Sequence, residues 1–415
     1  MENLRPLIAG MPLLIPALQG DPISVKRLIT LDEDIDAAAL EEAINRTVKV
    51  FPLIGKKIEE LDGVYYYVDN PLPFVITKGL REVETFLPEG NYHSMTFAYD
   101  KNKLSILMNH MFFDGTGIKM VLETLFYHYF CIVDKKNYDV PAGVFVEPSE
   151  GLIAEPFPHK FETDDAPFFD NNSDTEDIFK FPEEDYSMSK EELIKATDLI
   201  TVTADSKEFM RYVKSVGGTP LSSMASLFFT IFQQSHPENK KILKTLTSVS
   251  LRGISEAPDT ILNAAYALTY FSTPEDALKV NADSERARNV ELRNLLKRYK
   301  EPDNLKKIAN NWYDRNGMCK NLLKNPEEMK NWRMPTAAVP FYVVYVGTIH
   351  LGEYAKHIVN MQFFSKINPV YSCIIFEAGN KFFINLRQPF HSDIYKNNLI
   401  EALHQRGVTS ARIEI

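Results

Sequence analysis

Apolar residues recur along this chain at two spacings, one typical of strands and one typical of helices. Residues 104–109 largely alternate apolar and polar side chains, which predicts a half-buried strand. Residues 118–129 place apolar side chains three and four positions apart, which predicts one face of a helix. Gly115 and Gly117 lie between the two patterns and permit the sharp turn that joins a strand to a helix.

The same alternation appears in both parts of the chain. The predicted elements are a strand over 25–32, a helix over 36–50, a hairpin over 56–68, a strand over 199–203, helices over 206–216 and 221–233, a strand over 242–251, a hairpin over 371–386 and a final helix over 394–404. Strands that alternate with helices predict an α/β protein built in two layers. A chain of 415 residues is long enough for two such units.

One acidic segment separates the two units. Residues 162–192 contain twelve Asp or Glu residues and two lysines, a net charge of −10, with proline and asparagine among them. This composition predicts a solvated linker or lid. We therefore expect an N-terminal part over 1–160, a linker over 161–192 and a C-terminal part over 193–415.

The N-terminal segment 6–18 is apolar but contains Pro6, Pro12 and Pro16, with Glu2 ahead of it. Three prolines disfavour a helix, so we expect an extended arm, with a secretory signal as the alternative. No apolar run reaches the roughly 18 residues that a membrane helix needs, so no membrane insertion is expected.

Composition excludes several functions. The net charge of −10 and the pI near 5.5 disfavour a nucleic-acid partner. Cys131, Cys319 and Cys373 have no close spacing, which argues against a disulfide framework or a zinc site. We therefore expect no metal and a reducing, cytoplasmic location.

The junction at 109–117 carries the candidate chemistry. His110 ends the predicted strand beside the N-terminus of the predicted helix. An imidazole can accept a proton from a hydroxyl or amine, and free N–H groups at a helix N-terminus favour nearby negative charge. Asp114 can act as a general acid, orient the ring or anchor the turn, and the spacing does not choose among these roles. The alternative is a core histidine in a strand-turn-helix without chemistry.

This segment resembles the HxxxDG motif of the chloramphenicol acetyltransferase-like superfamily, which includes alcohol acetyltransferases, plant-type BAHD acyltransferases, wax ester synthases and condensation domains of peptide synthetases. Residues 248–253, with Arg252, are similar to the Asp-x-Arg segment of that superfamily, and Leu262 and Asn263 to its trailing Leu-x-Asn. Residues 340–347 resemble its Tyr-x-Gly strand. Ser250 replaces the usual aspartate, the plant-type Asp-Phe-Gly-Trp-Gly signature is absent, and Asn109 replaces the first histidine of condensation domains.

The resemblance implies two chloramphenicol acetyltransferase-like half-domains with a tunnel between them. There, His110 would deprotonate a hydroxyl or amine acceptor as it attacks an acyl thioester. Asp114 and Arg252 would form a structural ion pair beside Gly115. Candidate oxyanion donors are the Thr116 hydroxyl, the backbone N–H groups of residues 115–117 and the amide of Asn263. Tyr345 is a candidate for the tunnel wall.

A basic segment is the candidate for donor binding. Residues 286–334 contain 13 Lys or Arg residues and six acids, a net charge of +7. Arg293, Lys297 and Arg298 are the residues expected to meet the phosphates of coenzyme A or an acidic carrier domain. The alternative is a solvated helix face.

Three functions remain open. The first is an acyltransferase that uses acyl-CoA as co-substrate and binds no resident cofactor. The second is a condensation-type enzyme that depends on an acyl carrier protein. The third is a non-catalytic relative that binds a ligand in the tunnel.

Overall fold

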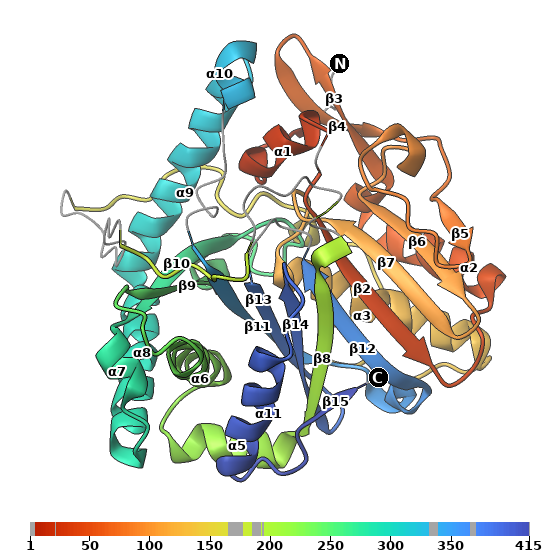
Figure 1. Cartoon of the computed structure of the whole chain (residues 1–415). Coiled ribbons are helices and arrows are strands. Elements are labelled where there is room, and N and C mark those ends of the chain that lie inside the picture. The colour runs from red at the N-terminus through yellow and green to blue at the C-terminus, as the bar shows by residue number, and fades with distance from the viewer. Residues whose placement is uncertain are drawn as a thin grey trace.

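The computed structural model describes residues 5–20, 22–164, 177–184, 192, 195–331, 339–365 and 371–414, which form three β-sheets and surrounding helices (Figure 1). The strands are β1 (Arg5–Pro6), β2 (Ser24–Leu31), β3 (Lys56–Leu61), β4 (Val64–Asp69), β5 (Ile76–Lys78), β6 (Met95–Asp100), β7 (Lys103–Asn109), β8 (Asp198–Asp205), β9 (Leu243–Ser250), β10 (Ala265–Ser272), β11 (Phe341–Ile349), β12 (Ile358–Ser365), β13 (Tyr371–Ala378), β14 (Lys381–Gln388) and β15 (Arg412–Glu414). The helices are α1 (Met11–Leu18), α2 (Ala37–Val50), α3 (Gly115–Val133), α5 (Ser206–Ser215), α6 (Pro220–Ser235), α7 (Pro274–Leu278), α8 (Ala282–Tyr299), α9 (Pro302–Leu322), α10 (Pro326–Asn331) and α11 (Ile394–Gln405).

A five-stranded sheet forms the N-terminal part, in the order β12-β2-β7-β6-β5. Strands β2 and β7 run antiparallel, with Ser24 opposite Asn109, so β2 begins where β7 ends. Asp36 caps the N-terminus of helix α2, and its carboxylate accepts hydrogen bonds from the backbone N–H groups of residues 38 and 39. Helices α2 and α3 pack against each other. This arrangement fixes the end of β7, from which the chain turns into α3.

Strand β12 comes from the C-terminal part of the chain but completes the N-terminal sheet. It pairs with β2 from Ile358 opposite Leu31 to Ser365 opposite Val25. The sheets therefore do not follow the expected division at residues 160 and 193. The exchange of a strand ties the two parts into one structure.

A seven-stranded sheet forms the C-terminal part, in the order β10-β9-β11-β13-β14-β8-β15. Alternate residues of each strand face opposite sides of it. One face packs against α5, α6 and α11, and buries Val343, Cys373 and Ile384. The other face contributes Tyr342, Ile374 and Phe376 to the core shared with the N-terminal sheet. The site therefore lies between two sheets from different parts of the chain.

The N-terminal segment corrects one expectation, because residues 11–18 form helix α1 and not an extended arm. Pro12 lies in the first turn, where its missing N–H costs nothing, but Pro16 lies inside the helix. Burial outweighs this local penalty, since Met11, Leu14 and Ile15 are fully buried. Tertiary packing thus overrides the proline signal.

The acidic segment is also only partly described, since residues 165–176 and 185–191 lie outside the described residues. Residues 177–184 do not behave as a solvated linker. Ile178 forms a bridge with Ile242, and the rings of Phe179 and Phe181 are buried in the core beneath the seven-stranded sheet. Part of the predicted linker is therefore anchored to the C-terminal half.

Glu123 is a carboxyl group buried in the middle of α3. Its side chain is 0% exposed, Oε1 accepts a hydrogen bond from the backbone N–H of His350 at 2.6 Å, and Oε2 has no partner among the described residues. Burial raises the pKa of Glu123 from 4.5 to about 7, against the opposing effect of the His350 N–H. The folded protein therefore holds this proton more tightly than the unfolded chain does.

This shift predicts a pH dependence of stability. As pH rises from 4.5 to about 7, the unfolded chain loses the proton first, so the contribution of Glu123 to the free energy of unfolding falls and then levels off. We expect Glu123→Gln to remove this slope and to be more stable than wild type by about 3 kcal/mol above pH 7. Denaturant unfolding of both proteins across this range measures the difference. A difference that does not change with pH would contradict the assignment.

Candidate active site

His110 follows β7 and is held by its backbone and by its ring. Its N–H donates to the carbonyl of Ile23 at 2.8 Å, which continues the pairing of β7 with β2. Nδ1 of the ring lies 2.6 Å from the carbonyl oxygen of Phe113. Because a carbonyl only accepts, Nδ1 carries the proton. In the neutral ring Nε2 is then the free acceptor, and His110 lines a cavity.

The neighbouring Asn109 stabilises the turn. Its side-chain oxygen accepts a hydrogen bond from the N–H of Met111 at 2.9 Å, and its amide nitrogen donates to the Thr85 hydroxyl at 3.3 Å. Both groups are buried. Asn109 is thus a structural part of the strand end.

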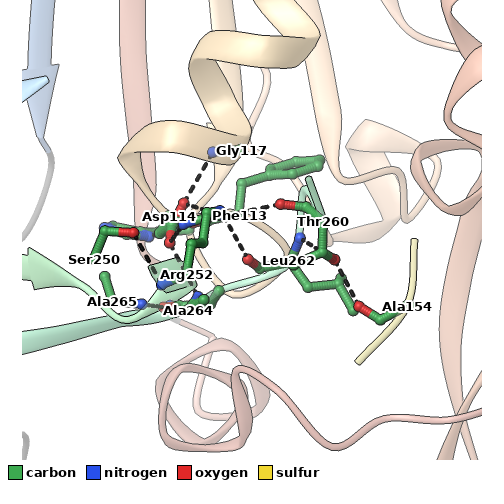
Figure 2. A network of polar contacts seen from close by, with 12 residues as sticks. Phe113, Asp114, Gly117, Ala154, Ser250, Arg252, Thr260, Leu262, Ala264 and Ala265 are labelled. Carbon is green, nitrogen blue, oxygen red and sulfur yellow. Dashed lines mark hydrogen bonds and ion pairs between the residues drawn. The ribbon is translucent and has the colours of Figure 1, made fainter. Parts of the chain in front are cut away.

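Asp114 caps α3 and joins the two halves of the protein (Figure 2). Its Oδ1 accepts hydrogen bonds from the N–H of Gly117 and from Nη2 of Arg252, both at 2.9 Å. Its Oδ2 accepts from Nη1 of Arg252 at 2.5 Å and from the N–H of Ala264 at 3.0 Å. The side chains of Asp114 and Arg252 are 2% and 9% exposed. The carboxylate is thus saturated by four donors, none of which is His110.

Arg252 also binds the loop that follows β9. Its Nη2 donates to the carbonyls of Thr260 and Leu262, at 2.9 and 3.0 Å. The hydroxyl of Ser250 accepts a hydrogen bond from the N–H of Arg252 at 3.3 Å. The pair expected from the sequence is present, and it braces the loop as well as the helix.

Gly117 is required by a close contact between these two parts. A Cβ atom added at this position would lie 1.9 Å from the carbonyl oxygen of Ile261. Gly115 differs, since a Cβ atom there would meet nothing within 4 Å. Gly117 therefore permits the approach of the two halves, whereas Gly115 leaves space at the cavity wall.

The cavity beside His110 has a volume of about 240 Å³ and is lined by both halves. The N-terminal half contributes residues of α1, β2 and α3, and the C-terminal half contributes residues of α9, β9, β10, β11 and β13. Gly10 precedes α1 with φ +84, and a Cβ atom there would lie 2.1 Å from the Met111 carbonyl oxygen. Helix α1 therefore closes this wall directly against the turn that carries His110.

The other candidates from the sequence divide into two groups. Gly115 and Asn263 line the cavity, and the oxygen of Asn263 accepts from the N–H of Ala265 at 3.2 Å, which leaves its amide nitrogen as a donor. Thr116, Gly117 and Tyr345 do not line it. Tyr345 stacks on Phe382 at 6.2 Å, on the other face of the seven-stranded sheet. Tyr342 of the same strand lines the cavity instead.

The basic segment meets the cavity at a different residue from those expected. Arg293, Lys297 and Arg298 of α8 are not among the lining residues, whereas Arg315 and Trp312 of α9 are. Arg27 of β2 also lines the cavity and was not identified from the sequence. A sequence signal existed for it, since Arg27 occupies an inward position between Val25 and Ile29 in an alternating strand.

Groups of metal ligands and membrane helices are absent from the described part of the chain. It contains no group of three or more His, Cys, Asp or Glu residues that could hold a metal ion. None of its helices is both long and apolar enough to cross a membrane.

Comparison with known proteins identifies the fold. No family model and no curated protein sequence matches this chain. Among solved structures, it is similar to F. graminearum TRI101 complexed with coenzyme A and T-2 mycotoxin, with 10% identity, a TM-score of 0.59 and 99% of each chain covered. It is also similar to TRI3 trichothecene 15-O-acetyltransferase from Fusarium sporotrichioides, with 10% identity, a TM-score of 0.59, and 98% of this chain and 95% of that one covered.

A third similar structure is the first condensation domain of the calcium-dependent antibiotic synthetase, with 11% identity and a TM-score of 0.60, covering 99% of this chain and 98% of that domain. The fold predicted from the sequence, two chloramphenicol acetyltransferase-like α/β halves, is thereby confirmed. At these identities the likeness concerns the fold alone.

Proposed function

We propose that this protein is an acyltransferase that moves an acyl group from a thioester to a hydroxyl or amine, with His110 as general base. The observation that carries the proposal is the state of the His110 ring. Nδ1 is occupied by the Phe113 carbonyl, so Nε2 is the basic nitrogen of a residue that lines a cavity between the two halves.

The proposed reaction needs no covalent acyl-enzyme. Nε2 takes the proton of the acceptor as its oxygen or nitrogen attacks the thioester carbonyl. The tetrahedral oxyanion then collapses, the carbon–sulfur bond breaks, and the thiolate leaves with the proton from His110. Asn263 is the best supported oxyanion donor, because its amide nitrogen remains available beside the cavity, and the N–H of Gly115 is the second candidate.

Acyl-CoA is the proposed donor. TRI101 was crystallised with coenzyme A, and TRI3 is named as an acetyltransferase. Arg315 supports this choice, since it adds a positive charge to the cavity wall. The role proposed from the sequence for Arg293, Lys297 and Arg298 has less support because they lie away from that wall.

We also propose a cytoplasmic location. The three cysteines form no disulfide, which agrees with a reducing compartment.

A second candidate function is condensation with a carrier-bound acyl group. The similar condensation domain favours it. Asn109 argues against it, because the first position of the double histidine has a structural role here. The intact His110 argues against a purely ligand-binding role.

Thiol release tests the proposal. Purified protein is incubated with acyl-CoA of increasing chain length and a panel of alcohols and amines, and free coenzyme A is measured with a thiol reagent alongside mass spectrometry of the acylated product. We expect acceptor-dependent thiol release for at least one pair of substrates. Transfer only from a loaded carrier protein would favour the second function, and binding of acyl-CoA without transfer to any acceptor would favour a ligand-binding role.

A further inference from the structure

Arg27 places a buried positive charge in the wall of the cavity. It lies on β2 between Val25 and Ile29, whose side chains share the inward face of the sheet. The residue is 2% exposed and lines the same cavity as His110. Arginine is rarely buried to this extent unless it is paired.

The contacts of Arg27 do not include a carboxylate. Nη1 donates to the backbone carbonyl of Lys26 at 3.0 Å, and the guanidinium lies 4.3 Å from the ring centre of Phe363. Nε and Nη2 make no hydrogen bond with any described residue. Arg252, by contrast, is paired with Asp114 and two carbonyls.

The charges around the cavity also favour an anion. Asp114 is the only acidic residue among the described lining residues, and its charge is matched by Arg252. Arg27 and Arg315 remain as cations of the wall. Burial lowers the pKa of Arg27 to about 9, so the side chain still carries its charge at neutral pH.

We infer that Arg27 binds a carboxylate on the substrate, at a point remote from the group that reacts at His110. This inference rests on the proposed acyl transfer and narrows its substrate class. Nε and Nη2 lie on one side of the guanidinium and form a fork that matches two carboxylate oxygens. The Arg27 guanidinium balances the single charge of a carboxylate, and Arg315 is the cation of the wall that remains for the phosphates of the donor.

The strand pairing sets the length of such a substrate. The N–H of His110 bonds to Ile23, and Arg27 lies four residues further along β2, which corresponds to about 13 Å between their backbone positions at the rise of a strand. The two side chains shorten this span from both ends. The substrate is therefore an extended molecule with its reacting group and its carboxylate several bonds apart.

Binding of a matched pair of probes tests the inference without turnover. Trp312 lines the cavity, and the chain has only one other tryptophan, so Trp332→Phe leaves Trp312 as the sole reporter. Hexanoate and hexanamide have the same shape and differ in charge. In fluorescence titrations at neutral pH we expect hexanoate to bind roughly tenfold or more tightly than hexanamide. Equal affinities, or no saturable binding of hexanoate, would overturn the inference.

Three variants assign the preference to Arg27. Arg27→Met keeps much of the side-chain volume and should abolish the preference for hexanoate, while Arg27→Lys should keep part of it. Lys26→Met is the control, since it also removes one positive charge, at the neighbouring residue. The Lys26 side chain pairs with Glu82 and does not line the cavity. Should Arg27→Met fail to fold, the comparison of Arg27→Lys with wild type still decides. If Arg27→Met still prefers hexanoate, Arg27 does not bind the carboxylate. The same conclusion follows if Arg27→Lys keeps the full preference while Lys26→Met abolishes it.

Transfer assays then locate the carboxylate. If it lies on the acyl chain, glutaryl-CoA should have a higher kcat/KM than pentanoyl-CoA in wild type, and Arg27→Met should reverse the order. If it lies on the acceptor, both donors should react alike, and a hydroxy acid should outperform its amide. Transfer that shows neither preference overturns the inference. A hexanoate preference without transfer of any acyl group supports Arg27 and refutes the proposed function, so that the two failures are distinct.

Discussion

Replacing His110 with alanine should lower kcat by about 10²-fold or more, because the variant lacks the base that takes the acceptor proton. His110→Asn is the sharper variant. The amide nitrogen of asparagine can occupy the position of Nδ1 and donate to the Phe113 carbonyl, but nothing replaces Nε2. We therefore expect His110→Asn to keep the melting temperature of wild type and to lose as much activity as His110→Ala.

The matched control is His159→Ala. This histidine is 63% exposed, pairs with Glu256 and does not line the cavity. Its replacement should leave kcat unchanged. Initial rates of thiol release and thermal melts of all four proteins make the comparison. If the activity of His110→Asn stays within a few-fold of wild type, His110 is not the general base.

The elements around the site could be predicted because their patterns are local. The alternation in β7, the three-and-four spacing of α3 and the glycines between them each reflect the structure of a few neighbouring residues. The expected strands and helices of the second half, from β8 to α6, follow for the same reason. The register of β2 on β7 is a pairing across many residues, and it is this pairing that brings Arg27 and His110 to one cavity.

Features that depend on distant contacts were missed. Strand β12 belongs to the sheet of the other half, and its own residues do not encode the partner. Helix α1 forms despite Pro16 because its apolar residues are buried by elements far along the chain. The cost of an internal proline is local, whereas the compensating burial is visible only in the fold.

The tyrosine of β11 shows how a family resemblance can select the wrong face. The resemblance pointed to Tyr345 because it precedes Val346 and Gly347. In a strand, however, only alternate residues share a face, and Tyr342, Val344 and Val346 line the cavity. Tyr345 faces the opposite side of the sheet, where its ring stacks on Phe382. Because alternate residues of a strand face the same side, one known cavity-facing residue of β11 would have pointed to Tyr342.

Among substitutions around the site, loss of the ion pair between Asp114 and Arg252 should lower the free energy of unfolding the most. Asp114→Ala leaves a guanidinium with 9% of its side chain exposed and without its carboxylate, and it frees the N–H groups of Gly117 and Ala264. Breaking a buried pair costs about 3 to 5 kcal/mol, since the remaining charge stays buried. Activity should fall with stability, because the same contacts hold the loop that carries Asn263 against α3.

A charge-neutral double variant separates the pair from its surroundings. Asp114→Ala combined with Arg252→Met removes both charges, so its free energy of unfolding should be higher than that of Asp114→Ala alone. Asp314→Ala is the exposed control, since its pair with Lys160 also joins the two halves but is 57% exposed on the acid, and its loss should cost no more than about 1 kcal/mol. Denaturant unfolding measures all four proteins. A cost for Asp114→Ala no larger than that of the control, or a double variant no more stable than Asp114→Ala, would show that the pair does not brace the two halves as its geometry indicates.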